Sequence, residues 1–215
     1  EFTTAGGVSA NHVAKWNGSS WSALGTGVSD DVSALTVGAA GNLYAGGSFT
    51  TAGGVSANHV AKWNGTSWSA LGSGTDNWVM SLVISGAGNL YAGGSFTAAG
   101  GVIANHVAKW NGSNWSALGS GSNYEVDALV MDGAGNLYAG GNFTTAGGAS
   151  ACCVAKWNGS NWSVLGNGPW AHTLAMDGTG NLFAGGDFVT AGGINANRVA
   201  RWNGNSWLAL GDQGG

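Results

Sequence analysis

The 215-residue chain has few charged residues, a single proline (Pro169) and only two cysteines. Charged residues make up 7% of the sequence, whereas ordinary soluble domains contain roughly 25%. Its six cations and its net charge of −4 provide no basic surface of the kind that binds nucleic acid or an anionic membrane. We therefore expect neither nucleic acid nor a membrane among the partners.

Long apolar runs and disulfide spacing are also missing from the sequence. No run of about 18 apolar residues, the length that a membrane-spanning helix needs, occurs in it. The cysteines are the neighbours Cys152 and Cys153, so no disulfide framework is expected. The chain opens at Glu1-Phe2, inside a repeat and without a signal-peptide pattern. Low charge with abundant Gly, Ser, Thr, Asn and Trp favours an extracellular or cell-surface location.

The motif Trp-Asn-Gly recurs along the whole chain at a nearly constant spacing. It begins at Trp16, Trp63, Trp110, Trp157 and Trp202, with intervals of 47, 47, 47 and 45 residues. A fixed period of this size is typical of a repeat architecture. We expect one domain, residues 1–215, with repeats at approximately 1–25, 26–72, 73–119, 120–166 and 167–215.

Each complete repeat contains four short apolar segments, which we call strands a, b, c and d in chain order. In one copy they are residues 79–84, 90–96, 106–110 and 115–118. None reaches helical length, and Val, Leu, Tyr, Phe and Trp predominate in them. Asn-Gly between c and d is a strong hairpin signal because both residues tolerate positive φ. The sequence therefore predicts four antiparallel strands in each repeat.

Strand b consists mainly of small residues, as in Leu-Tyr-Ala-Gly-Gly at residues 43–47. Small side chains allow a neighbouring layer to approach closely. Four-stranded sheets in which small residues face bulky Trp and Leu suit face-to-face stacking around an axis, which is the β-propeller architecture. The predicted fold is therefore an all-β propeller of four-stranded antiparallel blades.

The same segments resemble the kelch family of propeller repeats. Leu-Tyr-Ala-Gly-Gly resembles the second kelch strand, and Val-Ala-Lys-Trp-Asn-Gly-Ser-Ser-Trp at residues 13–21 resembles the third and fourth strands. Lys-Trp replaces the usual Tyr-Asp, and the b–c connection is long, so the resemblance does not imply a blade number. The period and copy number are similar to those of the tachylectin-type lectins, whose propellers have five blades.

The strand count is uneven along the chain. Strands c and d occur five times, whereas strands a and b occur four times, because residues 1–25 contain only a c–d pair. We expect a five-bladed ring with one incomplete blade. One alternative is four closed blades plus an extra hairpin. A second is recruitment of strands from other copies of the chain, because unpaired edges promote association.

The connection from strand d to the next strand a is the variable part of the repeat. The four connections are residues 28–31, 75–78, 122–125 and 169–172. We expect these d–a loops to share one face with the b–c loops and to bind a ligand there. Aromatic residues of this set suit stacking on a sugar ring, and polar ones suit hydrogen bonding to its hydroxyls. The expected ligand-binding residues are Asp31, Asn77, Trp78, Tyr124, Glu125 and Trp170.

No catalytic or metal-binding pattern emerges from the repeats. His12, His59 and His106 lie 47 residues apart, hence on separate blades, so we expect a structural role beside the b–c loop and no metal. His172 is interpreted as a lone surface residue. The glycine runs lack the strand–helix context and the Lys-Ser/Thr pair of a phosphate loop. We therefore expect no cofactor and no enzymatic activity.

Two functional classes remain open. The first is a lectin-like module with several weak carbohydrate sites on one face, which together gain avidity when the ligand spans them. The alternative is a structural repeat protein of a surface layer or filament, or an engineered repeat without a ligand.

Overall fold

Residues 1–210 are described by a computed structural model, and they form strands and turns without any helix. Within this range no helix is long and apolar enough to cross a membrane. The strands assemble into four sheets of four antiparallel strands and several two-stranded hairpins. The all-β architecture of repeated four-stranded blades is therefore confirmed.

The four complete blades share the order a-b-c-d within each sheet. Blade 1 consists of β5 (Val32–Val37), β6 (Leu43–Gly47), β9 (Val60–Trp63) and β10 (Trp68–Ala70). Blade 2 consists of β11 (Val79–Ile84), β12 (Leu90–Gly94), β15 (Val107–Trp110) and β16 (Trp115–Ala117). Blade 3 consists of β17 (Val126–Met131), β18 (Leu137–Gly141), β21 (Val154–Trp157) and β22 (Trp162–Val164). Blade 4 consists of β23 (Thr173–Met176), β24 (Leu182–Gly185), β27 (Val199–Trp202) and β28 (Trp207–Ala209).

A two-stranded half blade precedes them. It consists of β3 (Ala14–Trp16) and β4 (Trp21–Ala23), which correspond to strands c and d. The long b–c connections, together with the corresponding segment before β3, fold into short hairpins. These are β1 (Thr4–Ala5) with β2 (Val8–Ser9), β7 (Thr51–Ala52) with β8 (Val55–Ser56), β13 (Ala98–Ala99) with β14 (Val102–Ile103), β19 (Thr145–Ala146) with β20 (Ala149–Ser150), and β25 (Thr190–Ala191) with β26 (Ile194–Asn195).

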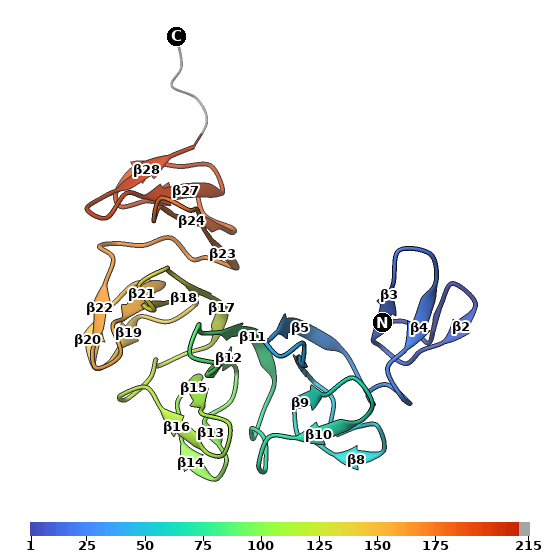
Figure 1. The fold of residues 1–215 in the computed structure, drawn as a ribbon. Coiled ribbons are helices and arrows are strands. Elements are labelled where there is room, and N and C mark those ends of the chain that lie inside the picture. Colours follow the sequence, from blue (N-terminus) through green and yellow to red (C-terminus); the bar gives the residue numbers. More distant parts are fainter. Residues whose placement is uncertain (211–215) are drawn as a thin grey trace.

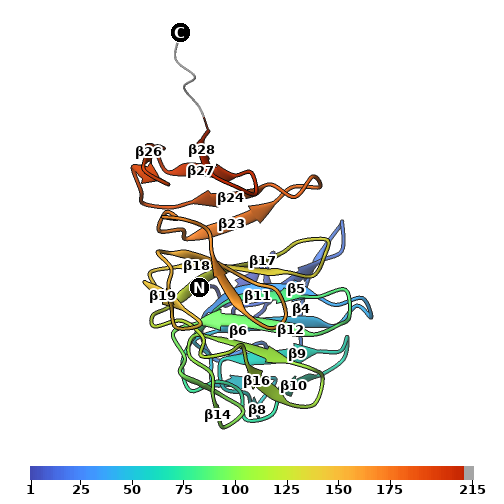
Figure 2. The same cartoon turned by 90° about the vertical axis from the view of Figure 1, so that its left-hand side faces the viewer.

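The blades are arranged radially. Strands β5, β11 and β17 lie near the centre, and the d strands lie outside, with the half blade and blade 4 at the two ends of an open arc (Figure 1). From the side, blade 4 lies at one end of the stack, next to blade 3 (Figure 2). The described residues therefore supply four complete blades and one half blade. The count of five for a closed ring stays a prediction.

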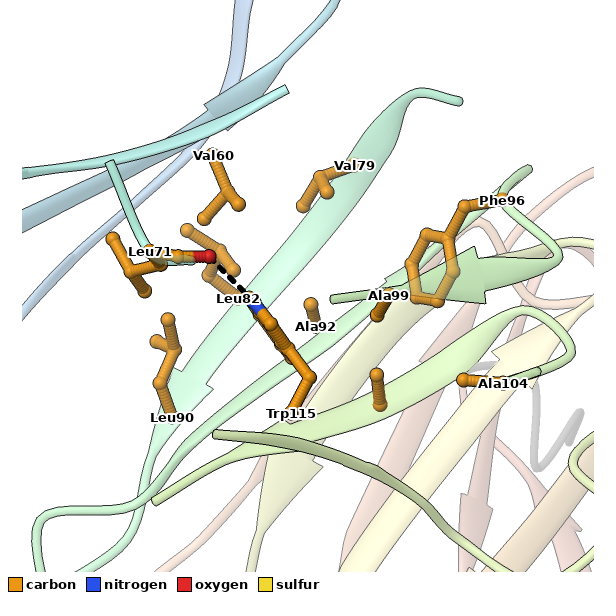
Figure 3. Packing of buried hydrophobic residues seen from close by; sticks show 11 residues of the cluster. Val60, Leu71, Val79, Leu82, Leu90, Ala92, Phe96, Ala99, Ala104 and Trp115 are labelled. Carbon is orange, nitrogen blue, oxygen red and sulfur yellow. Dashed lines mark hydrogen bonds between the residues drawn. The ribbon is translucent and has the colours of Figure 1, made fainter. Parts of the chain in front are cut away.

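Adjacent blades pack through the glycines of strand b. A methyl group on Gly46 of β6 would lie 2.5 Å from Val79 Cγ1 and 3.2 Å from Leu82 Cδ1, both on strand a of the next blade. Neither distance leaves room for a side chain without displacement. Figure 3 shows the cluster that Val79 and Leu82 join, with Val60 and Leu71 from blade 1. The small residues of strand b therefore permit the close blade-to-blade contact expected from the sequence.

The tryptophans of each blade make a second contact between blades. Trp110 and Trp115 are directly opposite across strands c and d, with ring centroids 5.5 Å apart. Trp115 Nε1 donates a hydrogen bond of 2.7 Å to the Leu71 carbonyl oxygen at the end of the previous blade (Figure 3). The same bond recurs from Trp68, Trp162 and Trp207 to Leu24, Leu118 and Leu165. Each bond therefore links one d strand to the preceding one.

Replacing Trp115 with Phe should destabilise the protein by about 1–3 kcal/mol, because the buried Leu71 carbonyl loses its donor. Urea unfolding followed by far-UV circular dichroism measures the change. Trp21→Phe is the matched control, since Trp21 occupies the same repeat position in the half blade but is 42% exposed. We expect its free energy of unfolding to change by less than about 0.5 kcal/mol. Equal losses in both variants would contradict the role of the interblade bond.

The turn between strands a and b is closed by an aspartate in blades 3 and 4. Asp132 Oδ1 accepts hydrogen bonds from the backbone N–H of Ala134 and Asn136, and Oδ2 accepts one from the Asn136 side chain. Partial burial opposes ionisation, but these hydrogen bonds outweigh it and lower the pKa of Asp132. Hydrogen bonds from Asn181 likewise hold the pKa of Asp177 well below its usual range.

These lowered pKa values predict a stability that decreases in acid. The contribution of each carboxylate is present above its unfolded-state pKa of about 3.9 and is lost as the pH falls through the lower folded-state pKa. Asp132→Ser copies the residue of blade 2, where Ser85 Oγ accepts from the Asn89 N–H. Urea unfolding between about pH 5 and pH 2 should therefore show a shallower pH dependence in Asp132→Ser and in Asp177→Ser. An unchanged slope in both variants would contradict the assignment.

Candidate loop-face binding site

The d–a and b–c loops emerge at the same end of each blade. Val32 at the start of β5 pairs with Gly47 at the end of β6, so the loops before one strand and after the other are neighbours. Their backbones also bond directly, with Ser29 N–H donating to the Thr51 carbonyl oxygen at 3.0 Å. We call this end of the blades the loop face. It is formed by residues 24–31, 71–78, 118–125 and 165–170 with the hairpins β7–β8, β13–β14, β19–β20 and β25–β26.

One variable position of the d–a loop has a structural role. Asp76 Oδ1 accepts hydrogen bonds from the backbone N–H of Thr97 and Ala98 at 2.8 and 2.9 Å. Asn123 Oδ1 accepts the equivalent pair in blade 3, and Ser29 Oγ accepts it in blade 1. Three different side chains therefore hold the b–c hairpin in place because each offers an acceptor oxygen. Part of the variation between repeats is consequently structural and does not belong to a ligand site.

The last residue of the d–a loop occupies one equivalent place in all four blades. In each blade its carbonyl oxygen lies against the second glycine of the Gly-Gly pair at the end of strand b, at Gly47, Gly94, Gly141 and Gly186. The residues at this place are Asp31, Trp78, Glu125 and Trp170, all of which the sequence proposes for binding. Trp170 therefore corresponds to Trp78, although Trp170 is the second residue of the connection 169–172 and Trp78 is the last residue of the connection 75–78. The difference arises because the last loop is shorter, in keeping with the final interval of 45 residues.

A pocket lies between blades 1 and 2 on the loop face. Its volume is ≈ 370 Å³ and it is lined by Asp30, Asp31, Ser33, Ser48, Trp78 and Met80. Trp78 is 53% exposed. The pocket brings Asp31 and Trp78 together, two of the residues expected to bind a ligand. The lining therefore combines Trp78 and Met80 of blade 2 with carboxylates and hydroxyls of blade 1.

Asp31 has an unusual environment beside this pocket. Its Oδ1 atom lies 3.7 Å from His12 Nδ1, beyond hydrogen-bond length. Both atoms are shielded from solvent, and neither has a hydrogen-bond partner within residues 1–210. Buried polar atoms generally have a hydrogen-bond partner, so these two atoms are an exception. The sequence pattern did not single it out, because His12 and Asp31 belong to different parts of the repeat.

The repeated histidines occupy a left-handed backbone conformation. His12, His59 and His106 each have a φ of 63°. In blade 1 the His59 N–H donates to the Phe49 carbonyl, and the His59 carbonyl accepts from the Gly47 N–H. These bonds close the b–c loop, which agrees with the expected structural role. Within residues 1–210 no group of three or more His, Cys, Asp or Glu side chains is arranged to hold a metal ion.

A charged network connects blades 3 and 4 on the same face. His172 Nδ1 lies 3.5 Å from Asp127 Oδ2, and His172 Nε2 lies 3.4 Å from Asp187 Oδ2. Arg198 Nη1 donates to Asp187 Oδ1 at 2.6 Å. His172 is a surface residue, as interpreted from the sequence, since its side chain is 43% exposed, but the fold also places it between two carboxylates. The Trp170 ring packs beside it, with centroids 5.0 Å apart.

Burial raises the pKa of Asp127 in this network. The neighbouring Glu125 charge acts in the same direction, whereas the Trp170 and His172 side chains favour the ionised form and limit the shift. Glu125 itself accepts a hydrogen bond of 2.7 Å from Ser95 Oγ of blade 2. The network therefore spans the junctions on both sides of blade 3.

The two remaining predicted residues lie apart from these groups. Tyr124 is 52% exposed and packs beside His106, with ring centroids 6.4 Å apart. Asn77 uses its side-chain oxygen locally, accepting a hydrogen bond of 2.8 Å from the Trp78 N–H. Asn77 therefore shapes the loop that presents Trp78 and does not line the pocket.

Comparisons with known proteins support the fold. No protein-family model and no curated protein matches the chain. The extracellular domain of a hybrid two-component system from B. thetaiotaomicron is similar over 85% of this chain, with 14% identity and a TM-score of 0.56. A streptogramin B lyase structure is similar over 85% of the chain, with 12% identity and a TM-score of 0.50. The chain spans 22% and 55% of the lengths of these two structures.

These likenesses concern architecture alone, because both identities are low. Together with the four repeated sheets they establish the β-propeller fold. The activity of either neighbour is not transferred to this chain.

The environments of Asp127 and Asp132 predict that their carboxyl groups have different pKa values. Carboxyl NMR should show Asp127 titrating above its ordinary value of 3.8 and Asp132 below it. His172→Gln should raise the pKa of Asp127 further, because it removes the imidazolium charge that favours the carboxylate. His59→Gln, in a different blade, serves as the matched control and should leave Asp127 unchanged. A pKa of Asp127 below that of Asp132 would contradict the described environment.

Proposed function

We propose that this protein is a non-enzymatic binding module that recognises carbohydrate through its loop face. The pocket between blades 1 and 2 carries the proposal, because its lining combines the exposed Trp78 with Asp30, Asp31, Ser33 and Ser48. An aromatic ring offers a flat apolar surface that suits the C–H face of a sugar. Carboxylates are strong acceptors for the hydroxyl groups on its edge.

The size and polarity of the pocket support a small polar ligand unit. Ligand pockets typically measure about 300–1,000 Å³, and ≈ 370 Å³ lies near the lower limit of that range. One ring of a glycan chain is a suitable occupant.

The same chemistry recurs around the inner rim of the loop face. The equivalent residues Asp31, Trp78, Glu125 and Trp170 alternate between carboxylate and tryptophan from blade to blade. Every junction between complete blades therefore combines one carboxylate with one tryptophan. Several weak sites in a fixed arrangement gain avidity for a repeating ligand without new contacts. The proposal includes an extracellular setting, where glycans are abundant, and assigns no catalytic step to this face.

Trp78→Ala should weaken glycan binding by at least about tenfold, because an aromatic anchor in a pocket commonly contributes more than about 1 kcal/mol. A glycan array would select the ligand, and isothermal titration calorimetry would measure its affinity. Asp31→Asn should also weaken binding, through loss of the charged acceptor.

Trp16→Ala is the matched control for this experiment. Trp16 is 48% exposed but lies on strand c of the half blade, away from the pocket. Its removal should leave the affinity unchanged. Glycan binding that survives both Trp78→Ala and Asp31→Asn would exclude this pocket, and the absence of any glycan ligand would refute the proposed function.

A further inference from the structure

The inner strand of blade 1 has an uncovered apolar face. Leu35 and Val37 on β5 are 51% and 60% exposed. The equivalent leucines of blades 2 and 3, Leu82 and Leu129, are each 8% exposed. The sequences of these strands are alike, so the difference comes from what lies against them.

In the complete blades, strand b of the preceding blade covers this face. Strand β6 contacts β11, β12 contacts β17 and β18 contacts β23. The contact depends on a glycine in strand b, since a methyl group on Gly93 would lie 2.6 Å from Val126 Cγ1 and 3.2 Å from Leu129 Cγ. Blade 1 follows the half blade, in which β3 and β4 form a sheet of two strands.

A hollow lies between the half blade and blade 1. Its volume is ≈ 540 Å³, and its walls come from β3, β4, β5 and β6 with Trp63 of β9. Leu35 and Val37 are part of its lining. The hollow is therefore bounded on one side by the half blade and on the other by the uncovered face of blade 1.

Strand β3, which lines this hollow through Ala14 and Lys15, also has one backbone edge without a described partner strand. In every complete blade strand c pairs with strand b in one register, as in Leu137↔Trp157, Tyr138↔Lys156, Ala139↔Ala155 and Gly140↔Val154. In the half blade the described partner of β3 is β4 alone. An exposed strand edge is a template for pairing with another chain.

We propose that the half blade and β5 together form an acceptor site for a β-hairpin with the chemistry of the repeat's own inner strands. Its second strand would pair with β3 as Leu opposite Trp16, Tyr opposite Lys15, Ala opposite Ala14 and Gly opposite Val13. The glycine face of this strand would cover Leu35. Main-chain bonds to β3 supply affinity and the fit of small residues supplies specificity, as in other cases of β-strand addition.

The three covered junctions within the chain support this occupant. The donor hairpin must have a small residue against Leu35 and an apolar residue opposite Trp16. It must also have a residue that tolerates a cation opposite Lys15, because Lys15 corresponds to Lys156. In blade 3 the Lys156 ammonium lies over the Tyr138 ring, 5.5 Å from its centroid. A hairpin with Leu-Tyr-Ala-Gly meets all three conditions. A helix or a bulky strand does not.

A synthetic peptide of residues 120–143 tests the proposal with the full chain. It contains both inner strands of blade 3 and no tryptophan, so tryptophan emission reports on the protein alone. We expect one peptide to bind per chain, with a blue shift of the emission as Trp16 becomes covered. Trp16→Phe should reduce the shift and leave the stoichiometry unchanged.

Two matched changes test the specificity of the site. The same peptide with Gly140→Val should bind at least about tenfold more weakly, because its side chain collides with β5. Leu35→Asp in the protein should weaken binding of the unmodified peptide to the same extent. Val55→Asp is the control, since Val55 is 45% exposed in β8, outside the hollow. Both protein positions are exposed, so both variants should fold.

Three results would overturn the proposal. The first is no binding at about 1 mM peptide, and the second is equal affinity for the Gly140→Val peptide. The third comes from light scattering: if Leu35→Asp abolishes self-association of the chain while the peptide does not bind, the face docks a whole second copy. Self-association that the peptide suppresses competitively would support the proposal and identify another copy as the donor.

Discussion

The contact between strand b of one blade and strand a of the next is the constraint on which the structure depends. Gly46 leaves no room for a methyl group against Val79, and Trp68 donates its indole hydrogen to a carbonyl 44 residues earlier, at Leu24. Each sheet buries its faces only against its neighbours, so stability is a sum over adjacent pairs. Where no strand b of a preceding blade is described, as beside β5, a leucine and a valine are exposed, and β3 of the half blade has β4 as its one described partner.

The loop face depends on the same packing. The blades hold the ends of the inner strands in a fixed arrangement, and acceptors such as Asp76 and Asn123 tie the b–c hairpins to them. Residues in the d–a loops are then free to differ in chemistry while keeping their position. The alternation of carboxylate and tryptophan at the inner rim follows from this division between a constant frame and variable ends.

Comparison of the repeats with one another identified the loop-face aromatics but not the charged network around His172. Repetition exposed the variable loops, and Asp31 and Trp78 do share a pocket. The partners of His172 could not be found in this way, because Asp127, Asp187 and Arg198 come from two blades and from different segments of the repeat. The shorter last loop also displaced Trp170 in the comparison, and only the backbone contact with Gly186 showed its equivalence to Trp78.

The sequence by itself determined the strands, the antiparallel pairing and the propeller architecture, because turn residues and small strand-b residues act locally and recur in every copy. It predicted strand c from His106, whereas the strand begins at Val107, because the φ of 63° at His106 is incompatible with a strand. Only the tertiary structure decided which surfaces are covered. Leu35 and Leu82 occupy the same place in the repeat, and their exposure differs because burial depends on a neighbouring blade.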